Sequence, residues 1–225
     1  MSAIDPSGGE RPGQLSIAVM VSGEGRGTNL AALLSACESG AIYGRIVVVI
    51  GTRADAPALL RAKTAGVATA VVSPRSYEGD DEAYGSTLLR HLDRHRAALI
   101  CLAGYMRKLP LKVLERYNGR VMNVHAALLP SFGGKGMYGE RVHQAVLDAG
   151  VKVTGCTVHF VDEEYDSGPI IVQKPVCVDE EDTAESLGAR VLDAEHSAYV
   201  EAVQLFAQHR LCIQDHRVRV HAVEK

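Results

Sequence analysis

Short apolar runs alternate with segments of helical periodicity along the first half of the chain. Four runs are apolar throughout, as expected of strands buried on both faces of a sheet. They cover residues 15–21, 46–50, 67–72 and 97–103. Apolar residues at helical spacing follow the first three runs, the first such segment with Thr28 or Asn29 as its expected N-cap and Gly40 as its stop. This alternation predicts an α/β fold with a Rossmann-like, doubly wound and mostly parallel sheet.

The second half is less regular. A short helix and a strand at residues 121–125 are followed by a glycine-rich loop and another helix. Two strands, 153–161 and 170–178, flank the turn 162–169 and are close enough to pair antiparallel, so the C-terminal part of the sheet is expected to be antiparallel. Asp182-Thr-Ala-Glu185 resembles a capping box that opens a long helix. The residues after Leu211 are expected to form an edge strand or a hairpin.

Composition limits the class of protein. The chain has 225 residues, 47% hydrophobic and 23% charged, with a formal charge of -3, which favours neither nucleic acid nor membrane as a partner. Its five scattered cysteines indicate reduced thiols and a cytoplasmic protein. Residues 1–14, rich in Ser, Gly and Pro, are predicted to be a disordered tail before a single domain, residues 15–225.

Asn123 and His125 lie two residues apart in the strand predicted for residues 121–125. Successive side chains of a strand point to opposite faces, so these two project on the same side. An amide can donate to a developing oxyanion, and an imidazole can give or take a proton near pH 7. The pair suits acyl transfer, although two satisfied polar side chains of a core strand would give the same pattern.

Asp166 lies in an acidic turn that a Gly-Pro pair ends with a chain reversal. A carboxylate brought near His125 would favour its imidazolium form, which suits a general acid. Residues 162–164 are by contrast expected to be a solvated acidic connection. A hydrolase triad and a metal site from His125, His143 and His159 stay open as alternatives, but the chain has no GxSxG elbow and no HExxH spacing.

A glycine-rich loop, residues 22–29, separates the first predicted strand from its helix. Free backbone N–H groups and the helix dipole make such a junction an anion site, and glycines let a phosphate approach the backbone. No Gly-Lys-Ser/Thr follows, and the match to GxGxxG is imperfect. One phosphate monoester therefore fits better than a dinucleotide, with a purely structural turn as the plainer alternative.

Two further segments are candidates for ligand contacts. Residues 106–109 follow the fourth predicted strand, at the edge where open α/β sheets bind ligands, and could line a flat apolar slot for a heterocycle. Glu195 lies at the margin of the apolar stripe of the last helix. A surface carboxylate is its default interpretation, and a contact to a substrate ammonium is the functional one.

Taken together, these residues resemble the phosphoribosylglycinamide formyltransferases, folate-dependent enzymes of purine synthesis. The resemblance extends from Leu15 to Leu211. It is carried by six stretches in order, which are Gly27-Thr-Asn-Leu30, Ala103-Gly-Tyr-Met-Arg107, Asn123-Val-His125 with Leu128-Leu-Pro130, residues 153–161, Asp166-Ser-Gly-Pro-Ile170 and Glu195-His196.

The resemblance implies transfer of a formyl group from 10-formyltetrahydrofolate to the glycyl amine of glycinamide ribonucleotide in de novo purine biosynthesis, by direct attack through a tetrahedral intermediate. It implies small-molecule substrates, no metal, and a monomer or homodimer. The catalytic residues would be Asn123, His125 and Asp166. The ribonucleotide would be held by Gly27, Thr28, Asn29 and Glu195. The folate would contact Met106, Arg107, Lys108, Leu109, Asn123, Asp162, Glu163, Glu164, Tyr165 and Asp166, with His143 near the entrance.

The chain departs from the family pattern at four places. Residues 24–26 are extra in the phosphate loop, and Ala126-Ala127 replaces the usual Pro-Ser after His125. Asp162 stands where a threonine is common. Asp81 occupies the expected place of an arginine before the third helix, with Arg75 as a candidate substitute. These departures concern the binding of the phosphate and the folate tail rather than the chemistry.

Related proteins remain as alternatives. A methionyl-tRNA formyltransferase would need a nucleic-acid-binding domain, and a formyltetrahydrofolate hydrolase would be expected to carry an amino-terminal regulatory module. A sugar-nucleotide formyltransferase is compatible with the length, but the phosphate loop favours the ribonucleotide. A non-catalytic Rossmann-like phosphate-binding module would use the glycine-rich loop, yet it would leave the convergence of Asn123, His125 and Asp166 unexplained.

Overall fold

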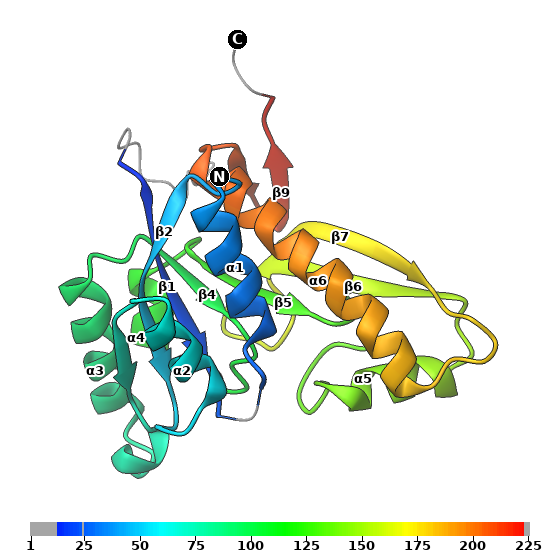
Figure 1. Ribbon diagram of the computed structural model, residues 1–225, viewed down its shortest axis with the longest axis horizontal. Coiled ribbons are helices and arrows are strands. Elements are labelled where there is room, and N and C mark those ends of the chain that lie inside the picture. The colour runs from blue at the N-terminus through cyan, green and yellow to red at the C-terminus, as the bar shows by residue number, and fades with distance from the viewer. Residues whose placement is uncertain (1–12, 24, 223–225) are drawn as a thin grey trace.

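Strands and helices alternate through the part of the chain that the computed structural model describes, residues 13–23 and 25–222 (Figure 1). The first half forms β1 (Leu15–Val21), α1 (Thr28–Glu38), β2 (Gly44–Gly51), α2 (Pro57–Thr64), β3 (Thr69–Val71), the 3-10 helix η1 (Pro74–Tyr77), α3 (Asp81–Arg94) and β4 (Leu99–Leu102). The second half forms α4 (Leu111–Arg116), β5 (Val121–His125), α5 (Glu140–Asp148), β6 (Val153–Phe160), β7 (Ile170–Cys177), α6 (Ala184–Ala207), β8 (Leu211–Gln214) and β9 (Arg217–Val220). The predicted disordered tail falls, except for residues 13 and 14, outside the described residues, as does Glu24.

Seven strands form one sheet in the order β3-β2-β1-β4-β5-β6-β7. The first five pair parallel, whereas β6 pairs antiparallel with both β5 and β7. The prediction of a mostly parallel, doubly wound sheet with an antiparallel C-terminal part is therefore confirmed. The residues after Leu211 form the hairpin β8–β9, a separate two-stranded sheet, rather than an edge strand of the main sheet.

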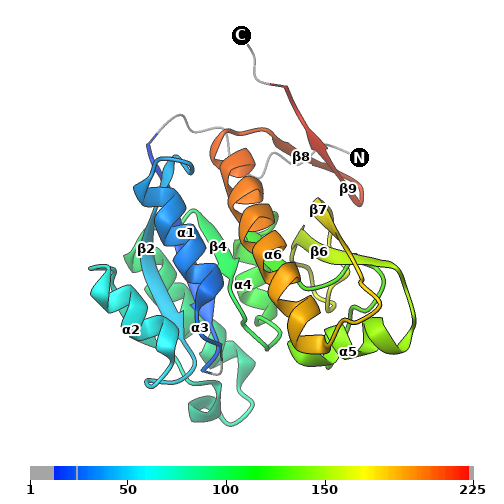
Figure 2. The same cartoon turned by 45° about the vertical axis from the view of Figure 1, so that its right-hand side comes forward.

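Helices cover both faces of the sheet. Alternate residues of β1 enter two different cores, with Ile17 and Val19 packed among α1, α2 and α6, and Ala18 and Met20 packed among α3 and α4. Strands buried on both sides need apolar residues throughout, which explains the unbroken apolar runs of the sequence. Helices α1 and α6 lie side by side over one face (Figures 1 and 2). Within the described residues, no helix is long and apolar enough to cross a bilayer.

The strand order reverses between β1 and β4, because the chain first moves outward through β2 and β3 and then returns to the other side of β1. Loops leave adjacent parallel strands in opposite directions at such a point and open a crevice beyond their carboxyl ends. The loops after β1 and β4 are joined there, since the Met106 backbone N–H donates to Ser22 Oγ at 2.9 Å. The crevice therefore gathers the glycine-rich loop, residues 106–109 and the end of β5.

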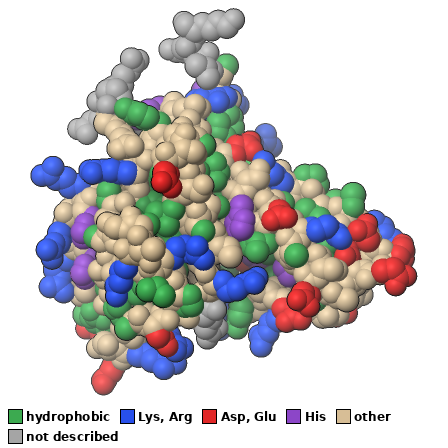
Figure 3. Space-filling model, viewed as in Figure 1, with side chains coloured by type: hydrophobic (Ala, Val, Ile, Leu, Met, Phe, Trp, Pro, Cys, Tyr) green, Lys and Arg blue, Asp and Glu red, His purple; other side chains and the backbone are tan. Residues whose placement is uncertain are grey.

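Helix α6 begins one residue later than its predicted capping box. Thr183 is the N-cap: its hydroxyl accepts from the Ser186 N–H at 3.1 Å, and Ser186 Oγ accepts from the Thr183 N–H at 3.0 Å. The assignment to Asp182 and Glu185 was wrong, because Asp182 is occupied by an ion pair with Arg190. Figure 3 shows the acidic side chains of this turn gathered at the end of the molecule where β7 passes into α6.

Candidate active site

The carboxyl ends of β1, β4 and β5 open into a cavity of about 1120 Å³. Most of the residues singled out in the sequence line it, namely Thr28, Asn29, Met106, Arg107, Lys108, Leu109, Asn123, His125, Asp162, Glu164, Tyr165, Asp166 and Glu195. Gly27 and Glu163 are not among its lining residues, and Glu163 is exposed. The fold thus brings segments more than 160 residues apart in the chain, such as Asn29 and Glu195, into one site.

Asn123 and His125 lie on the same face of β5, as strand alternation predicts. The antiparallel neighbour β6 places His159 opposite Asn123 and Thr157 opposite His125. Residues directly opposite each other on two strands have neighbouring side chains. His125 is 7% exposed and His159 is 2% exposed, so both imidazole rings of this strand pair are almost entirely buried.

His125 faces an oxygen acceptor with each of its ring nitrogens. Its Nε2 lies 2.8 Å from the backbone carbonyl oxygen of Phe132, and its Nδ1 lies 3.6 Å from Asp166 Oδ2. A carbonyl oxygen can only accept, so Nε2 carries a hydrogen. The 3.6 Å between Nδ1 and Asp166 Oδ2 is too long for a hydrogen bond. A hydrogen on Nδ1 would nevertheless be attracted to this carboxylate. The structure thus places Nδ1 beside the Asp166 carboxylate, on a ring that lines the cavity.

The loop after β5 is held in place by Thr157. Its hydroxyl accepts from the Leu129 N–H at 2.9 Å and donates to the Ala127 carbonyl at 2.7 Å, inside the protein. This anchoring fixes the chain on the way to Phe132, whose φ of 54° lies in the left-handed region. The Phe132 carbonyl is thereby brought to His125.

Asp166 is built into the site by the turn that carries it. Its φ is 54°, a conformation that Asp tolerates better than most residues. Its Oδ2 accepts from the Gly134 N–H at 2.8 Å, and its Oδ1 lies 3.7 Å from His159 Nε2. Gly168 lets this turn close against β6, because a Cβ there would lie 1.9 Å from the Phe160 carbonyl oxygen. The expected approach of Asp166 to His125 is therefore present in the structure.

The amino end of α1 has a different cap from the one expected. Gly27, not Thr28 or Asn29, is the N-cap, with φ 71° and no side-chain cap. A Cβ at this position would lie 2.9 Å from Ala58 Cβ, so α2 packs directly on the turn. Glycine satisfies both demands. The turn therefore exposes the uncapped first N–H groups of α1 beside the cavity, which is the arrangement that binds anions.

Glu195 crosses from α6 to meet α1. Its Oε2 accepts from Asn29 Nδ2 at 3.0 Å, and it is partly buried rather than a surface carboxylate. Burial raises the pKa of Glu195 to about 7, and the hydrogen bond from Asn29 offsets part of that rise. Asn29 Oδ1 has no hydrogen-bond partner among the described residues. This end of the cavity therefore offers the Glu195 carboxyl as an acceptor to a ligand that carries N–H or O–H groups.

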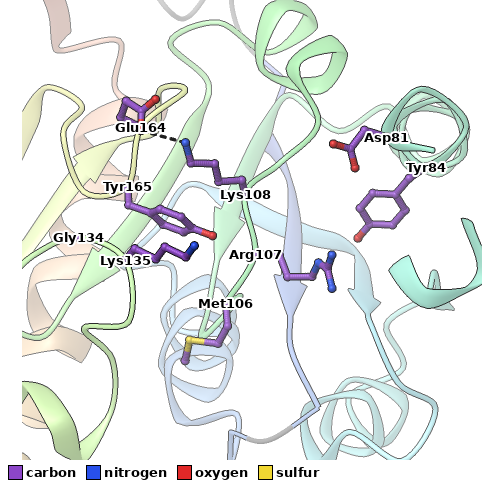
Figure 4. A pocket seen from close by; sticks show the side chains of 9 residues that line it. All are labelled: Asp81, Tyr84, Met106, Arg107, Lys108, Gly134, Lys135, Glu164 and Tyr165. Carbon is purple, nitrogen blue, oxygen red and sulfur yellow. Dashed lines mark hydrogen bonds and ion pairs between the residues drawn. The ribbon is translucent and has the colours of Figure 1, made fainter. Parts of the chain in front are cut away.

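A second cavity of about 730 Å³ adjoins the first and shares its wall from Met106 to Lys108 (Figure 4). Lys108 bridges its mouth, with Nζ 2.9 Å from Glu164 Oε2 and 5.3 Å from the centre of the Tyr165 ring. Figure 4 shows Asp81 and Tyr84 on α3 facing this space from the side of Arg107.

Lys135 also lines the second cavity, although no feature of the sequence marked it as a site residue. Its position in a glycine-rich loop carried no signal of its own. Asp81 does lie beside the predicted ligand segment, whereas Arg75, the candidate substitute for the family arginine, is not among the lining residues. Within residues 13–23 and 25–222, no three His, Cys, Asp or Glu side chains form a metal-binding group, so His125, His143 and His159 do not assemble one.

The family model for formyl transferases matches residues 15–203 of this sequence. The chain belongs to the formyl transferase family. A phosphoribosylglycinamide formyltransferase of Haemophilus influenzae is 38% identical over 202 residues, which cover 88% of this chain and 90% of that relative. Glycinamide ribonucleotide transformylase 1 from Symbiobacterium toebii, a crystal structure, has a TM-score of 0.86 and 44% identity, covering 95% of this chain and 99% of that one.

This chain is also similar to part of longer proteins. The trifunctional purine biosynthetic protein adenosine-3 of Gallus gallus is 42% identical over 194 residues, or 86% of this chain. The match spans only 18% of that protein's length. The assignment to the formyl transferase family therefore rests on the family model and on relatives of nearly the same length as this chain. It confirms the family expected from the sequence.

Proposed function

We propose that this formyl transferase moves the formyl group of 10-formyltetrahydrofolate to the glycyl amine of glycinamide ribonucleotide. The observation that carries the proposal is the convergence of Asn123, His125 and Asp166, with 3.6 Å between the imidazole and the carboxylate, beside an open helix amino end. The two adjoining cavities, about 1120 and 730 Å³, are each of the size that holds a small organic ligand. They leave room for two substrates.

The ribonucleotide phosphate lies at the N–H groups that begin α1, where Gly27, Thr28 and Asn29 present backbone donors. Glu195 accepts a hydrogen bond from the glycyl amine. The folate ring lies between residues 106–109 and the turn 162–166, with its tail toward the second cavity. This division follows from charge and polarity: the helix amino end suits the phosphate, and the exposed Met106 offers an apolar surface to the ring.

Catalysis rests on charge stabilisation and proton movement by three side chains. As the amine attacks the formyl carbon, the oxygen of that carbon gains negative charge, and Asn123 Nδ2–H and His125 Nδ1–H donate to it. Asp166, fixed by the Gly134 N–H, keeps the positive charge on His125. A bond forms from the glycyl nitrogen to the formyl carbon and the bond to the folate nitrogen breaks. One proton leaves the first nitrogen and one joins the second.

An absorbance assay with a formylated folate analogue tests the proposal. Formyl transfer predicts a spectral change only when the ribonucleotide and the folate are both present. A hydrolase would give the change with the folate alone, and a phosphate-binding module would give none in any mixture. Either of the last two results would contradict the proposal.

Variants locate the activity in the proposed site. His125→Ala is expected to lower kcat by a factor of about 10² to 10³, the usual loss for one oxyanion donor. Asp193→Asn, an exposed carboxylate on α6 that does not line the cavity, is the matched control and should keep wild-type turnover. Near-native turnover in His125→Ala would remove the imidazole from the mechanism.

A further inference from the structure

A buried histidine adjoins the catalytic side chains without a part in the mechanism above. His159 lies directly opposite Asn123 on the neighbouring strand. Its Nε2 is 3.2 Å from Asn123 Nδ2, and its Nδ1 is 2.8 Å from the Phe160 carbonyl oxygen. With 2% of its surface exposed, the ring has no room to exchange these partners for water.

The Phe160 carbonyl determines which ring nitrogen of His159 carries the hydrogen. A carbonyl oxygen has no hydrogen to give, so Nδ1 must be the donor of the 2.8 Å hydrogen bond. Burial also lowers the pKa of His159, which favours the neutral ring. In the neutral ring with a hydrogen on Nδ1, Nε2 has a free lone pair and can only accept.

An accepting Nε2 in turn fixes the amide of Asn123. The two ends of an amide have nearly the same shape, but only the nitrogen end can donate to a lone pair. If the amide were rotated by half a turn, its oxygen would face the Nε2 lone pair of His159 and two acceptors would meet. Asn123 therefore directs Nδ2 toward β6. One of the two Nδ2 hydrogens bonds His159, and the other is left for a ligand in the cavity.

The charges around His159 show why the neutral form matters. Asp166 Oδ1 lies 3.7 Å from Nε2, and Asp162 also favours the protonated ring, whereas His125 opposes it. A proton on Nε2 would be attracted to Asp166 and would turn the acceptor for Asn123 into a donor. Asn123 Nδ2 would then lose its acceptor, and the protonated His159 would compete with His125 for the carboxylate of Asp166.

We propose that His159, as the neutral tautomer with its hydrogen on Nδ1, is a positioning residue that fixes the side-chain amide of Asn123 with Nδ2 as the donor toward the transferring formyl oxygen. The proposal rests on the proposed function, because it assumes that Asn123 stabilises that oxygen. His159 acts through the orientation of a neighbour.

Nitrogen NMR of the histidine rings in the wild-type chain tests the tautomer without any substitution. Protonated and bare ring nitrogens resonate far apart, so the expected spectrum shows His159 with hydrogen on Nδ1 and a bare Nε2 at pH 7 and above. The loss of the signal pair in a His159→Gln sample assigns it. A hydrogen on Nε2 would overturn the proposal, whatever the enzyme's activity.

Turnover measurements test the positioning role. His159→Phe removes the acceptor at nearly constant volume and is expected to lower kcat about 10- to 100-fold, the range for a misplaced catalytic group, with KM little changed. His159→Gln, whose side-chain oxygen can accept from Asn123, should restore most of the lost turnover. In an Asn123→Ala background, His159→Phe should cause no further loss, because the group it positions is gone.

The outcomes separate this proposal from the proposed function. An equal loss from His159→Phe in the wild-type and Asn123→Ala backgrounds would show a general structural effect and overturn the positioning role. Near-native kcat in His159→Phe, with a large loss in Asn123→Ala, would do the same. If Asn123→Ala itself keeps full turnover, the role of Asn123 in the proposed function fails, while the NMR result still reports on the tautomer.

Discussion

Replacing Glu195 by Gln should change how the stability of the protein depends on pH. The carboxyl has a pKa raised from 4.5 to about 7 by burial, so the folded protein holds its proton where the unfolded chain has released it. Below pH 4.5 both states are protonated. Between 4.5 and about 7 the wild type loses stability at about 1.4 kcal/mol per pH unit from this group, and above 7 the loss levels off near 3 kcal/mol. Gln keeps an acceptor for Asn29 and carries no charge, so the variant lacks this loss.

Urea unfolding from pH 4 to pH 9 measures the effect. The free energy of unfolding of Glu195→Gln minus that of the wild type should rise through this range and become constant above pH 7. Glu38→Gln, an exposed carboxylate at the end of α1, is the matched control and should follow the wild type at every pH. Parallel curves for Glu195→Gln and the wild type would refute the reasoning that burial holds this proton.

Three further substitutions test the geometry. Gly168→Ala places a Cβ 1.9 Å from a backbone oxygen, so urea unfolding should show a free energy of unfolding lower by about 1–3 kcal/mol. The kcat should also fall, because Asp166 moves with the turn. An unchanged kcat would show that the activity does not depend on the turn. Gly27→Ala, at φ 71°, should lower the free energy of unfolding in urea by about 1–2 kcal/mol and raise KM for the ribonucleotide. A change in KM for the folate alone would contradict the placement of the phosphate at this turn. Glu164→Gln removes an exposed ion pair with Lys108, so the free energy of unfolding should change by less than about 1 kcal/mol. Hydrogen exchange in residues 162–168 should speed up, because this ion pair holds the turn against Lys108. Unchanged exchange would show that the ion pair does not hold the turn.

Apolar patterning predicted the sheet well because its strands are buried on both faces. Such strands leave unbroken apolar runs, and the loops between them show glycines and caps. Boundaries were less certain: β3 covers Thr69–Val71 where 67–72 was expected, and β4 covers Leu99–Leu102 within the predicted 97–103. At β3 the sheet ends, so fewer residues have a partner to pair with.

The caps show where local patterns lost to tertiary contacts. Thr28 and Asn29 are good N-cap residues by type, but close packing against Ala58 places Gly27 at the cap. At α6, an ion pair with Arg190 removes Asp182 from the capping box. Ala58 is far from Gly27 in the sequence, and Arg190, eight residues after Asp182, lies beyond the four residues that define a capping box.

The site was predictable only in part. Strand alternation placed Asn123 beside His125, and the chain reversal after Asp166 and the apolar stripe around Glu195 made these two residues candidates before the resemblance gave them roles. His159 was considered only as a metal ligand, because its role depends on the register between β5 and β6, which pairs it with Asn123. Lys135 and the second cavity depend on how a glycine-rich loop folds over residues 106–108, for which the sequence has no periodic signal.

The measurement that bears most directly on the central claim is single-turnover formyl transfer by Asp166→Asn, with both substrates saturating and the fold checked by circular dichroism. The amide keeps the shape of the side chain but removes the charge that faces His125 at 3.6 Å. The account predicts a rate lower by a factor of about 10² or more with an unchanged spectrum. A rate within a few-fold of the wild type would show that the imidazole and carboxylate do not act together.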